Sequence, residues 1–169
     1  YNILRIHTIL IRIIIKEQTM NFPLPPDCPY YLISRATLAV TSALKKGLIT
    51  AGVQEIKPAY LGVLIALWKD DDLKANELGK RAGLEPSTMT GLLDRMENDN
   101  LLKRRPDPHD RRASRIQLTR QGVDAEGPAS KVVTDILGNV LNNIDQKDID
   151  TTKNVLRQIL INCGKEGVQ

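Results

Sequence analysis

The chain has 169 residues, of which 41% are apolar and only 4% aromatic, so it can form one compact domain with an aliphatic core. Its two cysteines, Cys28 and Cys163, and its two histidines, His7 and His109, are too few for a disulfide framework or a Cys/His metal cluster, and a cytoplasmic location is expected. The formal net charge of +4 is small, so the position of the basic residues is more informative than their total.

Residues 1–19 differ in character from the rest of the chain. The apolar run Ile3–Ile15 is interrupted by Arg5, His7 and Arg12, which makes it too short and too charged to span a membrane. It also lacks the order of charges and the cleavage site of a signal peptide. We expect residues 1–19 to be a leader or a non-native extension, and the alternative is an amphipathic helix that adds to a dimer interface.

Helices are predicted on both sides of the centre of the chain. Apolar residues at helical spacing predict one helix from Tyr30 to about Ile49, a second from Gln121 to about Ile144 with a break at Gly127-Pro128, and a third capped by Asp145. One short chain offers little to cover all their apolar stripes. Residues 20–56 and 121–163 are therefore expected to form the helical dimerisation region of a homodimer, and residues 164–169 to fray.

Residues 57–120 have the pattern of a helix-turn-helix. Pro58 suits the first turn of a helix whose face would bury Leu61, Leu64, Ile65 and Trp68, and Asp70–Asp72 is expected to close it as a solvated turn. Two short helices follow. The first is capped by Gly83, and the second is opened by Pro86 and directs Met89, Leu92, Leu93 and Met96 inward.

A basic hairpin follows the two short helices. Strands are predicted at Leu101–Arg105 and Ser114–Thr119, and residues 103–115 hold six Lys or Arg against two Asp, a local charge of +4. An isolated basic hairpin is usually a solvated edge. Directly after a helix-turn-helix it predicts a winged helix that binds double-stranded DNA, with the second helix in the major groove and the hairpin on the flanking backbone. The expected fold class is mostly α with a small β hairpin.

The central block resembles the MarR (multiple antibiotic resistance regulator) family of winged-helix transcriptional regulators. The resemblance rests on LGKRAGLEPSTMTGLLDRME at residues 78–97, LLKRRPDPHDRRA at 101–113 and LTRQG at 118–122. It implies a homodimer with intertwined terminal helices that binds a DNA operator without a cofactor. It also implies a repressor that is released by a small lipophilic or phenolic ligand, held between the dimer helices and the DNA-binding lobe.

The resemblance also implies roles for individual residues. Those expected to contact DNA are Ser87, Thr88 and Thr90 in the groove, Arg95 near the backbone, Arg111 and Arg112 at the wing tip, and Lys74 and Asn76 near phosphate. Asp110 would orient Arg112, which would enter the minor groove. The family often has a larger polar residue at the position of Gly91, so direct base recognition is expected to be reduced here.

Two alternatives remain open from the sequence. Cys28 lies close before Tyr30, Tyr31 and Arg35, which is similar to the peroxide-sensing branch of the family, although the spacing to the arginine is about one residue short. The first alternative is therefore a peroxide-sensing regulator, against the plainer reading of an adventitious cysteine. The second is a winged-helix protein-interaction module without specific DNA binding. No catalytic residues and no metal ligands are expected, because the sequence shows no Ser/His/Asp or Cys/His arrangement and no phosphate loop.

Overall fold

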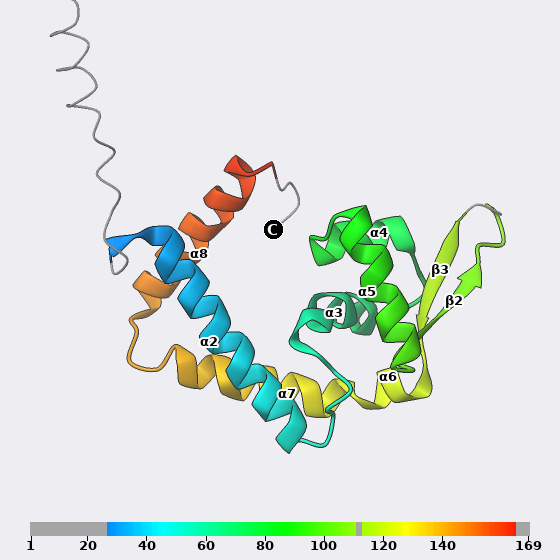
Figure 1. Ribbon diagram of the computed structural model, residues 1–169, viewed down its shortest axis with the longest axis horizontal. Helices are drawn as coiled ribbons and strands as arrows, with labels where there is room; N and C mark the ends of the chain where they lie inside the picture. The colour runs from blue at the N-terminus through cyan, green and yellow to red at the C-terminus, as the bar shows by residue number, and fades with distance from the viewer. Residues whose placement is uncertain (1–26, 111–112, 165–169) are drawn as a thin grey trace, which may run out of the picture. The chain divides into compact units, whose positions relative to one another are not determined.

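The computed structural model describes residues 27–110 and 113–164 (Figure 1). The chain divides into two compact units, residues 1–39 and 40–169. The elements in chain order are α2 (Pro29–Thr50), η2 (Pro58–Tyr60), α3 (Leu61–Lys69), β1 (Leu73–Lys74), α4 (Ala75–Ala82), α5 (Pro86–Asn98), β2 (Leu102–Pro106), β3 (Ser114–Leu118), α6 (Arg120–Asp124), α7 (Glu126–Val140) and α8 (Gln146–Asn162). The predicted fold class, mostly α with a small β hairpin, is confirmed. None of the described helices is long and apolar enough to cross a membrane.

The core of the second unit forms where α3, α4 and α5 pack beside the hairpin β2–β3 (Figure 1). The inward face predicted for α5 is confirmed, because all four of its apolar residues are buried. The face predicted for α3 is partly wrong: Ile65 is 52% exposed and Trp68 is half-buried. Leu61 and Leu64 are buried as predicted, and the rest of the buried face is formed by Tyr60, Val63, Ala66 and Leu67.

The turn between α4 and α5 is closed by glycine. Gly83 has a φ of 65°, a left-handed conformation that favours glycine, and the N–H of Leu84 donates to the carbonyl of Gly79 at 2.9 Å. Pro86 is the first residue of α5, where its missing N–H leaves no hydrogen bond unmade. Both boundary predictions for the helix-turn-helix are thus confirmed.

The wing is a three-stranded antiparallel sheet with the order β1-β3-β2. In β2 and β3, Leu102 pairs with Leu118 and Pro106 with Ser114, within one residue of the predicted strands. Strand β1 was not predicted, because two residues are too few to show an alternating pattern. It pairs Leu73 with Ile116, and this joins the start of the helix-turn-helix directly to the wing.

The helical region after the wing departs from prediction in two details. The break lies at Ala125, between α6 and α7, and not at Gly127-Pro128. Pro128 falls in the first turn of α7, where backbone N–H groups have no partner within the helix and a proline is tolerated. Asp145 does precede α8 as predicted, but its side chain makes no capping hydrogen bond.

The segment Thr119–Gly122 connects the wing to the helices behind it. The Thr119 hydroxyl donates to the carbonyl of Asn100 at 2.6 Å and accepts from the N–H of Gly122 at 3.1 Å. The indole N–H of Trp68 donates to the carbonyl of Gly122 at 2.9 Å. A Cβ at position 122 would lie 2.1 Å from the carbonyl oxygen of Leu101, so only glycine permits this approach of α6 to the start of β2.

Replacing Gly122 with alanine should therefore destabilise the fold. We expect Gly122→Ala to lower the free energy of unfolding by about 1–3 kcal/mol, the usual cost of overpacking, because the obstructing atom belongs to the backbone. Urea denaturation followed by circular dichroism measures this. The matched control is Gly127→Ala, because a Cβ at Gly127 meets nothing within 4 Å. Equal stability of the two variants would contradict the close approach.

Candidate nucleic-acid interface

The exposed face of α5 carries the residues predicted to enter the major groove. Ser87, Thr88, Thr90 and Arg95 are all exposed, opposite the buried apolar residues of the same helix. The Thr90 hydroxyl donates to the carbonyl of Pro86 at 3.1 Å, which fixes its rotamer while its oxygen still offers lone pairs. The structure thus gathers these four predicted residues on one surface.

Two acids on α5 are held by an arginine of the wing. The guanidinium of Arg104 on β2 contacts a carboxylate oxygen of Asp94 at 2.6 Å and also pairs with Glu97. The backbone N–H of Arg104 donates to the Glu97 carboxylate at 3.1 Å. This arginine therefore joins the wing to the recognition helix and neutralises acids that would otherwise repel phosphates.

The far end of α5 is joined to η2 by a second polar cluster. The carboxylate of Asp99 accepts hydrogen bonds from the Lys57 ammonium at 2.6 Å and from the buried Tyr60 hydroxyl at 2.7 Å. The hydrogen bond from Lys57 lowers the pKa of Asp99, and the same bond raises the pKa of Lys57. The sequence does not reveal this cluster, because Tyr60 and Lys57 lie 39 and 42 residues from Asp99 along the chain.

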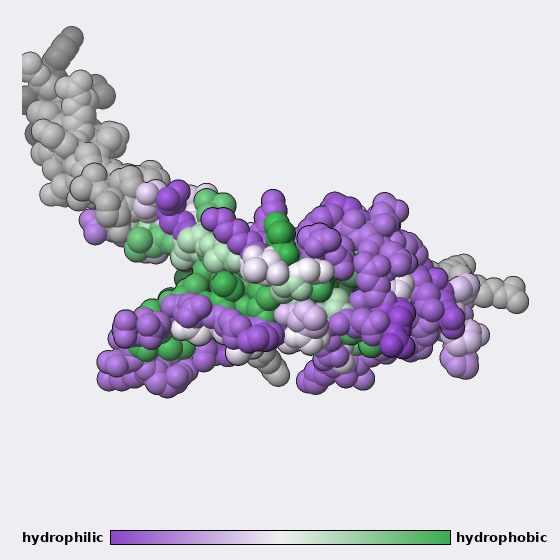
Figure 2. Space-filling view, turned by 90° about the horizontal axis from the view of Figure 1, so that it is seen from below, coloured by the Kyte–Doolittle hydropathy of each residue, from purple (hydrophilic) through white to green (hydrophobic). Residues whose placement is uncertain are grey.

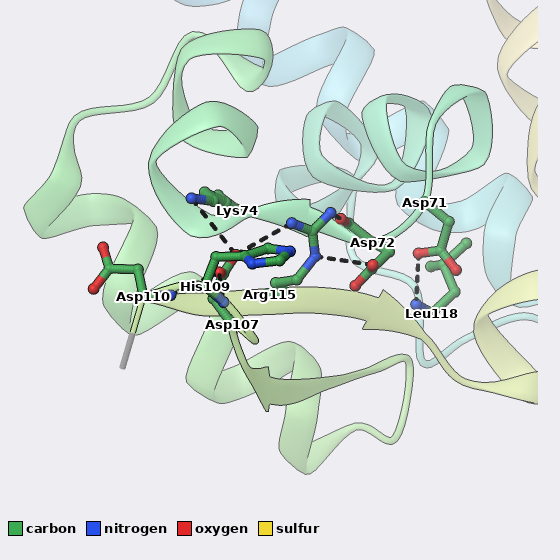
Figure 3. Close-up of polar contacts among 8 residues, drawn as sticks. All are labelled: Asp71, Asp72, Lys74, Asp107, His109, Asp110, Arg115 and Leu118. Atoms are coloured by element: carbon green, nitrogen blue, oxygen red, sulfur yellow. Dashed lines mark hydrogen bonds and ion pairs between the residues drawn. The ribbon is translucent and has the colours of Figure 1, made fainter. Parts of the chain in front are cut away.

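The loop of the wing is built around the buried side chain of Asp107 (Figure 3). One carboxylate oxygen accepts from the N–H groups of His109 at 2.8 Å and Asp110 at 3.0 Å. The other accepts from Arg115 at 3.2 Å and lies 3.6 Å from the Lys74 ammonium. The hydrogen bond from the backbone of His109 is the main cause that lowers the pKa of Asp107, and Arg115 and Lys74 lower it further.

The turn after α3 holds the other side of this arrangement. The Nε of Arg115 donates to the Asp72 carboxylate at 2.8 Å, and the N–H of Leu118 donates to Asp71 at 3.0 Å (Figure 3). Asp70 pairs with Arg81 at 2.7 Å. The turn at Asp70–Asp72 is solvent-exposed at Asp70 and Asp71, as predicted, and each of its acids also has a specific partner that the sequence did not reveal. We call Asp72, Lys74, Asp107 and Arg115 the wing anchor.

The basic residues of the hairpin have two different roles. Arg104 and Arg115 are held in ion pairs within the fold, so the +4 of this segment overstates the charge that a ligand would meet. Lys103 and Arg105 are exposed on β2. The predicted contacts at Arg111 and Arg112 lie outside the described residues. Figure 2 shows that the end of the molecule formed by the hairpin is covered by hydrophilic side chains.

The remaining predicted site residues lie around this surface. Lys74, a predicted phosphate contact, is directed at Asp107 and is therefore also part of the wing anchor. Asn76 is exposed in the first turn of α4. Asp110 is exposed, and its N–H donates to Asp107 within the loop. The predicted pairing of Asp110 with Arg112 involves a residue outside the described part of the chain.

Cys28 lies directly before α2 and is half-buried, and its carbonyl accepts from the N–H of Leu32 at 3.0 Å. Its oxidation stays a prediction. Within the described part of the chain, no group of three His, Cys, Asp or Glu residues could hold a metal ion.

Comparison with known proteins identifies this arrangement. The family model described as "MarR family" matches residues 57–114. The organic hydroperoxide resistance transcriptional regulator of Bacillus subtilis is 31% identical over 103 residues, which cover 61% of this chain and 68% of that protein. The chain belongs to the MarR family. The transcriptional repressor MdtR of the same organism is 39% identical over 69 residues, which cover 41% of this chain and 44% of MdtR, so the match spans less than half of that relative.

Solved structures of MarR-type regulators share the fold. PcaV of Streptomyces coelicolor in complex with its natural ligand has a TM-score of 0.73 at 21% identity, covering 81% of this chain and 94% of PcaV. CouR of Rhodococcus jostii RHA1 bound to p-coumaroyl-CoA has a TM-score of 0.65 at 23% identity, with 80% and 94% of the two chains covered. CouR bound to a 23-mer DNA duplex has a TM-score of 0.68 at 22% identity, with 79% and 93% covered.

The wing anchor yields a test in which charge and geometry predict opposite results. Asp107→Ala removes a negative charge from the wing, which by electrostatics alone strengthens binding to DNA. We expect affinity for duplex DNA to fall by about tenfold, because the loop loses the bonds that fix its backbone and must be ordered during binding. Fluorescence anisotropy measures the affinity.

The matched control for this test is Asp145→Ala. It removes the same charge from an exposed side chain that makes no capping hydrogen bond, and its DNA affinity should not fall. Tighter binding by a folded Asp107→Ala variant would show that the wing acts only as a cationic patch.

Proposed function

We propose that this MarR-family regulator binds a specific double-stranded DNA operator as a homodimer and represses transcription until a small ligand releases it. The single observation that carries this proposal is the polar face of α5, fixed to the wing by Arg104 and to η2 by Asp99. Such a rigid, hydroxyl-bearing helix suits the major groove, where Ser and Thr contact base edges or phosphates. CouR has been solved on a DNA duplex, and MdtR is named a repressor, which supports the proposal.

The wing would contact the DNA beside this groove. Arg111 and Arg112 lie outside the described residues, and we infer from the sequence that an arginine here enters a narrow minor groove, whose strong negative potential favours it. The exposed Lys103 and Arg105 on β2, together with Asn76 at the start of α4, are suited to neighbouring phosphates. Lys74 would contribute less, because Asp107 offsets part of its charge.

A homodimer would cover the apolar surface that the single chain leaves exposed. No residue of α8 is buried, although Leu156, Ile159 and Leu160 lie on one side of it at helical spacing. Only Leu48 is buried in α2, and Leu32 and Leu38 are exposed. Figure 2 shows apolar side chains at the surface among the helices. Apolar residues left exposed along one side of a helix in this way are typical of a protein interface.

Selection of binding sites from random duplex DNA tests this function. A homodimer with one recognition helix per subunit should select inverted repeats whose half-sites lie about 10 base pairs apart, or a multiple of this. Affinity for the selected site, measured by fluorescence anisotropy, should fall steeply as salt rises, because phosphate contacts release counterions. A winged helix used only for protein association would select no sequence, and that result would refute the proposal.

A cavity between α2 and α7 is the proposed site of the releasing ligand. It has a volume of about 630 Å³, in the range of small-molecule sites. It is lined by residues of α2, by the residue after it and by residues of α7: Ala43, Lys46, Gly47, Thr50, Ala51, Pro128, Lys131, Val132, Asp135 and Ile136. Its walls are mostly apolar, with Ala43, Val132 and Ile136, while Lys131 is paired with Asp135 at 2.8 Å. The ammonium of Lys46 has no ion pair within the described residues and is therefore suited to a carboxylate. These features favour an aromatic acid, and the solved structures include PcaV with its natural ligand and CouR with p-coumaroyl-CoA.

The predicted ligand class can be tested through release from DNA. Aromatic carboxylic acids should dissociate the wild-type protein from its selected site, because the ligand must bind the released conformation more tightly. In Lys46→Ala, DNA affinity should be unchanged, and the acid concentration for half release should rise by about tenfold, as for the loss of one charge-assisted contact. Lys45→Ala, an exposed neighbour outside the cavity, is the control. An unchanged response of Lys46→Ala would exclude this cavity as the acid site.

A further inference from the structure

Gly91 leaves a gap in the middle of the exposed face of α5. At 100° per residue, each step of four residues shifts the direction by about 40°, so Ser87, Gly91 and Arg95 form a slanting row that starts opposite the buried apolar residues and ends toward one edge of the exposed face. The row that would face the major groove therefore has a small side chain at its start, none in its middle and a long cation at its end.

The fold gives no reason for a glycine at this position. Gly91 is not among the residues with positive φ in the described chain, so its backbone conformation suits any residue. A Cβ built there would meet only the Nη1 atom of Arg95, at 3.6 Å, which is an ordinary contact with the end of a flexible side chain. Glycine in the interior of a helix costs about 1 kcal/mol relative to alanine, so this residue lowers stability without any packing benefit.

The side chain of Arg95 occupies the space above Gly91. Helical side chains lean toward the N-terminus, so a residue covers the turn that precedes its own Cα, and for Arg95 this turn contains Gly91. The 3.6 Å distance from Nη1 to the Cβ position of Gly91 shows that the guanidinium reaches this turn. It thus lies at the middle of the exposed face and not at its edge.

The acids nearest to Arg95 in sequence are all engaged by other groups. Asp94 and Glu97 pair with Arg104, and Asp99 accepts from Lys57 and Tyr60. Within the part of the chain that the structure describes, the Arg95 guanidinium makes no ion pair or hydrogen bond. Its donors therefore remain available, and the contacts that tie α5 to the wing and to η2 are what keep them so.

We propose that Arg95 recognises a guanine in the major groove through the space left by Gly91, and does not merely contact the DNA backbone. An arginine can donate two hydrogen bonds to O6 and N7 of guanine, the pairing most specific to this side chain. The inference rests on the proposed operator binding and adds a specificity-determining residue to it. It replaces the phosphate role that the resemblance to the family implied for this position.

Site selection with the full chain separates the two roles of Arg95. The wild type should prefer guanine at one position of each half-site by roughly 5- to 150-fold, the range for one bidentate contact. Arg95→Ala should lose this preference, keep the preferences at the other positions and retain the circular dichroism spectrum and the dimeric state. A phosphate contact would instead weaken binding to all sequences equally and reduce the salt slope, and that outcome would overturn the inference.

Variants of Gly91 test whether the gap itself matters. Gly91→Ala leaves room for the guanidinium and should keep the guanine preference, whereas Gly91→Gln fills the space and should abolish it although Arg95 is still present. Arg105→Ala removes an exposed arginine from β2 and is the matched control, with weaker binding and an unchanged selected sequence. Retention of the same preference by Gly91→Gln would overturn the inference alone. If the wild type selects no sequence at all, the proposed function itself fails.

Discussion

The geometry of the wing depends on one buried carboxylate. Asp107 accepts hydrogen bonds from two backbone N–H groups of its own loop and from Arg115 on β3, and it lies beside Lys74 at the start of α4. A buried charge is tolerated only when its hydrogen-bonding capacity is satisfied, so the loop, the sheet and the helix-turn-helix must be formed together. Because folding lowers the pKa of Asp107, its contribution to stability is present above the unfolded pKa and is lost as pH falls through the lowered folded value. The anchor is therefore intact throughout the neutral range.

The same contacts divide the basic residues into those that build the site and those that remain available to DNA. Arg104 forms ion pairs with Asp94 and Glu97 of α5, and Arg115 forms one with Asp72 of the turn after α3. These pairs hold the recognition helix and the wing at a fixed angle. Arg95 and Arg105 keep exposed guanidinium groups. A count of charges in the sequence cannot make this division, because the deciding partners lie up to 43 residues away. The net positive charge of a DNA-binding surface is thus smaller, and better placed, than its composition suggests.

The elements of the fold could be predicted because they rest on local patterns. The inward residues of α5, the caps at Gly83 and Pro86 and the two long strands follow from spacing and backbone preference alone. The features that were not predicted are either a very short strand or contacts between residues far apart in the sequence. Strand β1 has only two residues, and the role of Asp107 depends on partners brought together by the folded chain. At the site, the positions on α5 were predictable from the resemblance, whereas the direction of Lys74 toward a carboxylate was not.

The glycines of this chain fall into two kinds: some are required by close packing, and Gly91 is not. At Gly122 a Cβ would lie 2.1 Å from the backbone oxygen of Leu101, and at Gly47 it would lie 2.7 Å from a methyl group of Val132, so a larger residue at either position would force its neighbour to shift. At Gly91 nothing but the end of the Arg95 side chain is near. A residue that costs helix stability and relieves no contact has no structural explanation, but it does determine what lies on the exposed face of α5. The reduced base recognition expected from a glycine stays a prediction, and the nearness of the Arg95 guanidinium to Gly91 favours the opposite outcome, in which the arginine recognises a base.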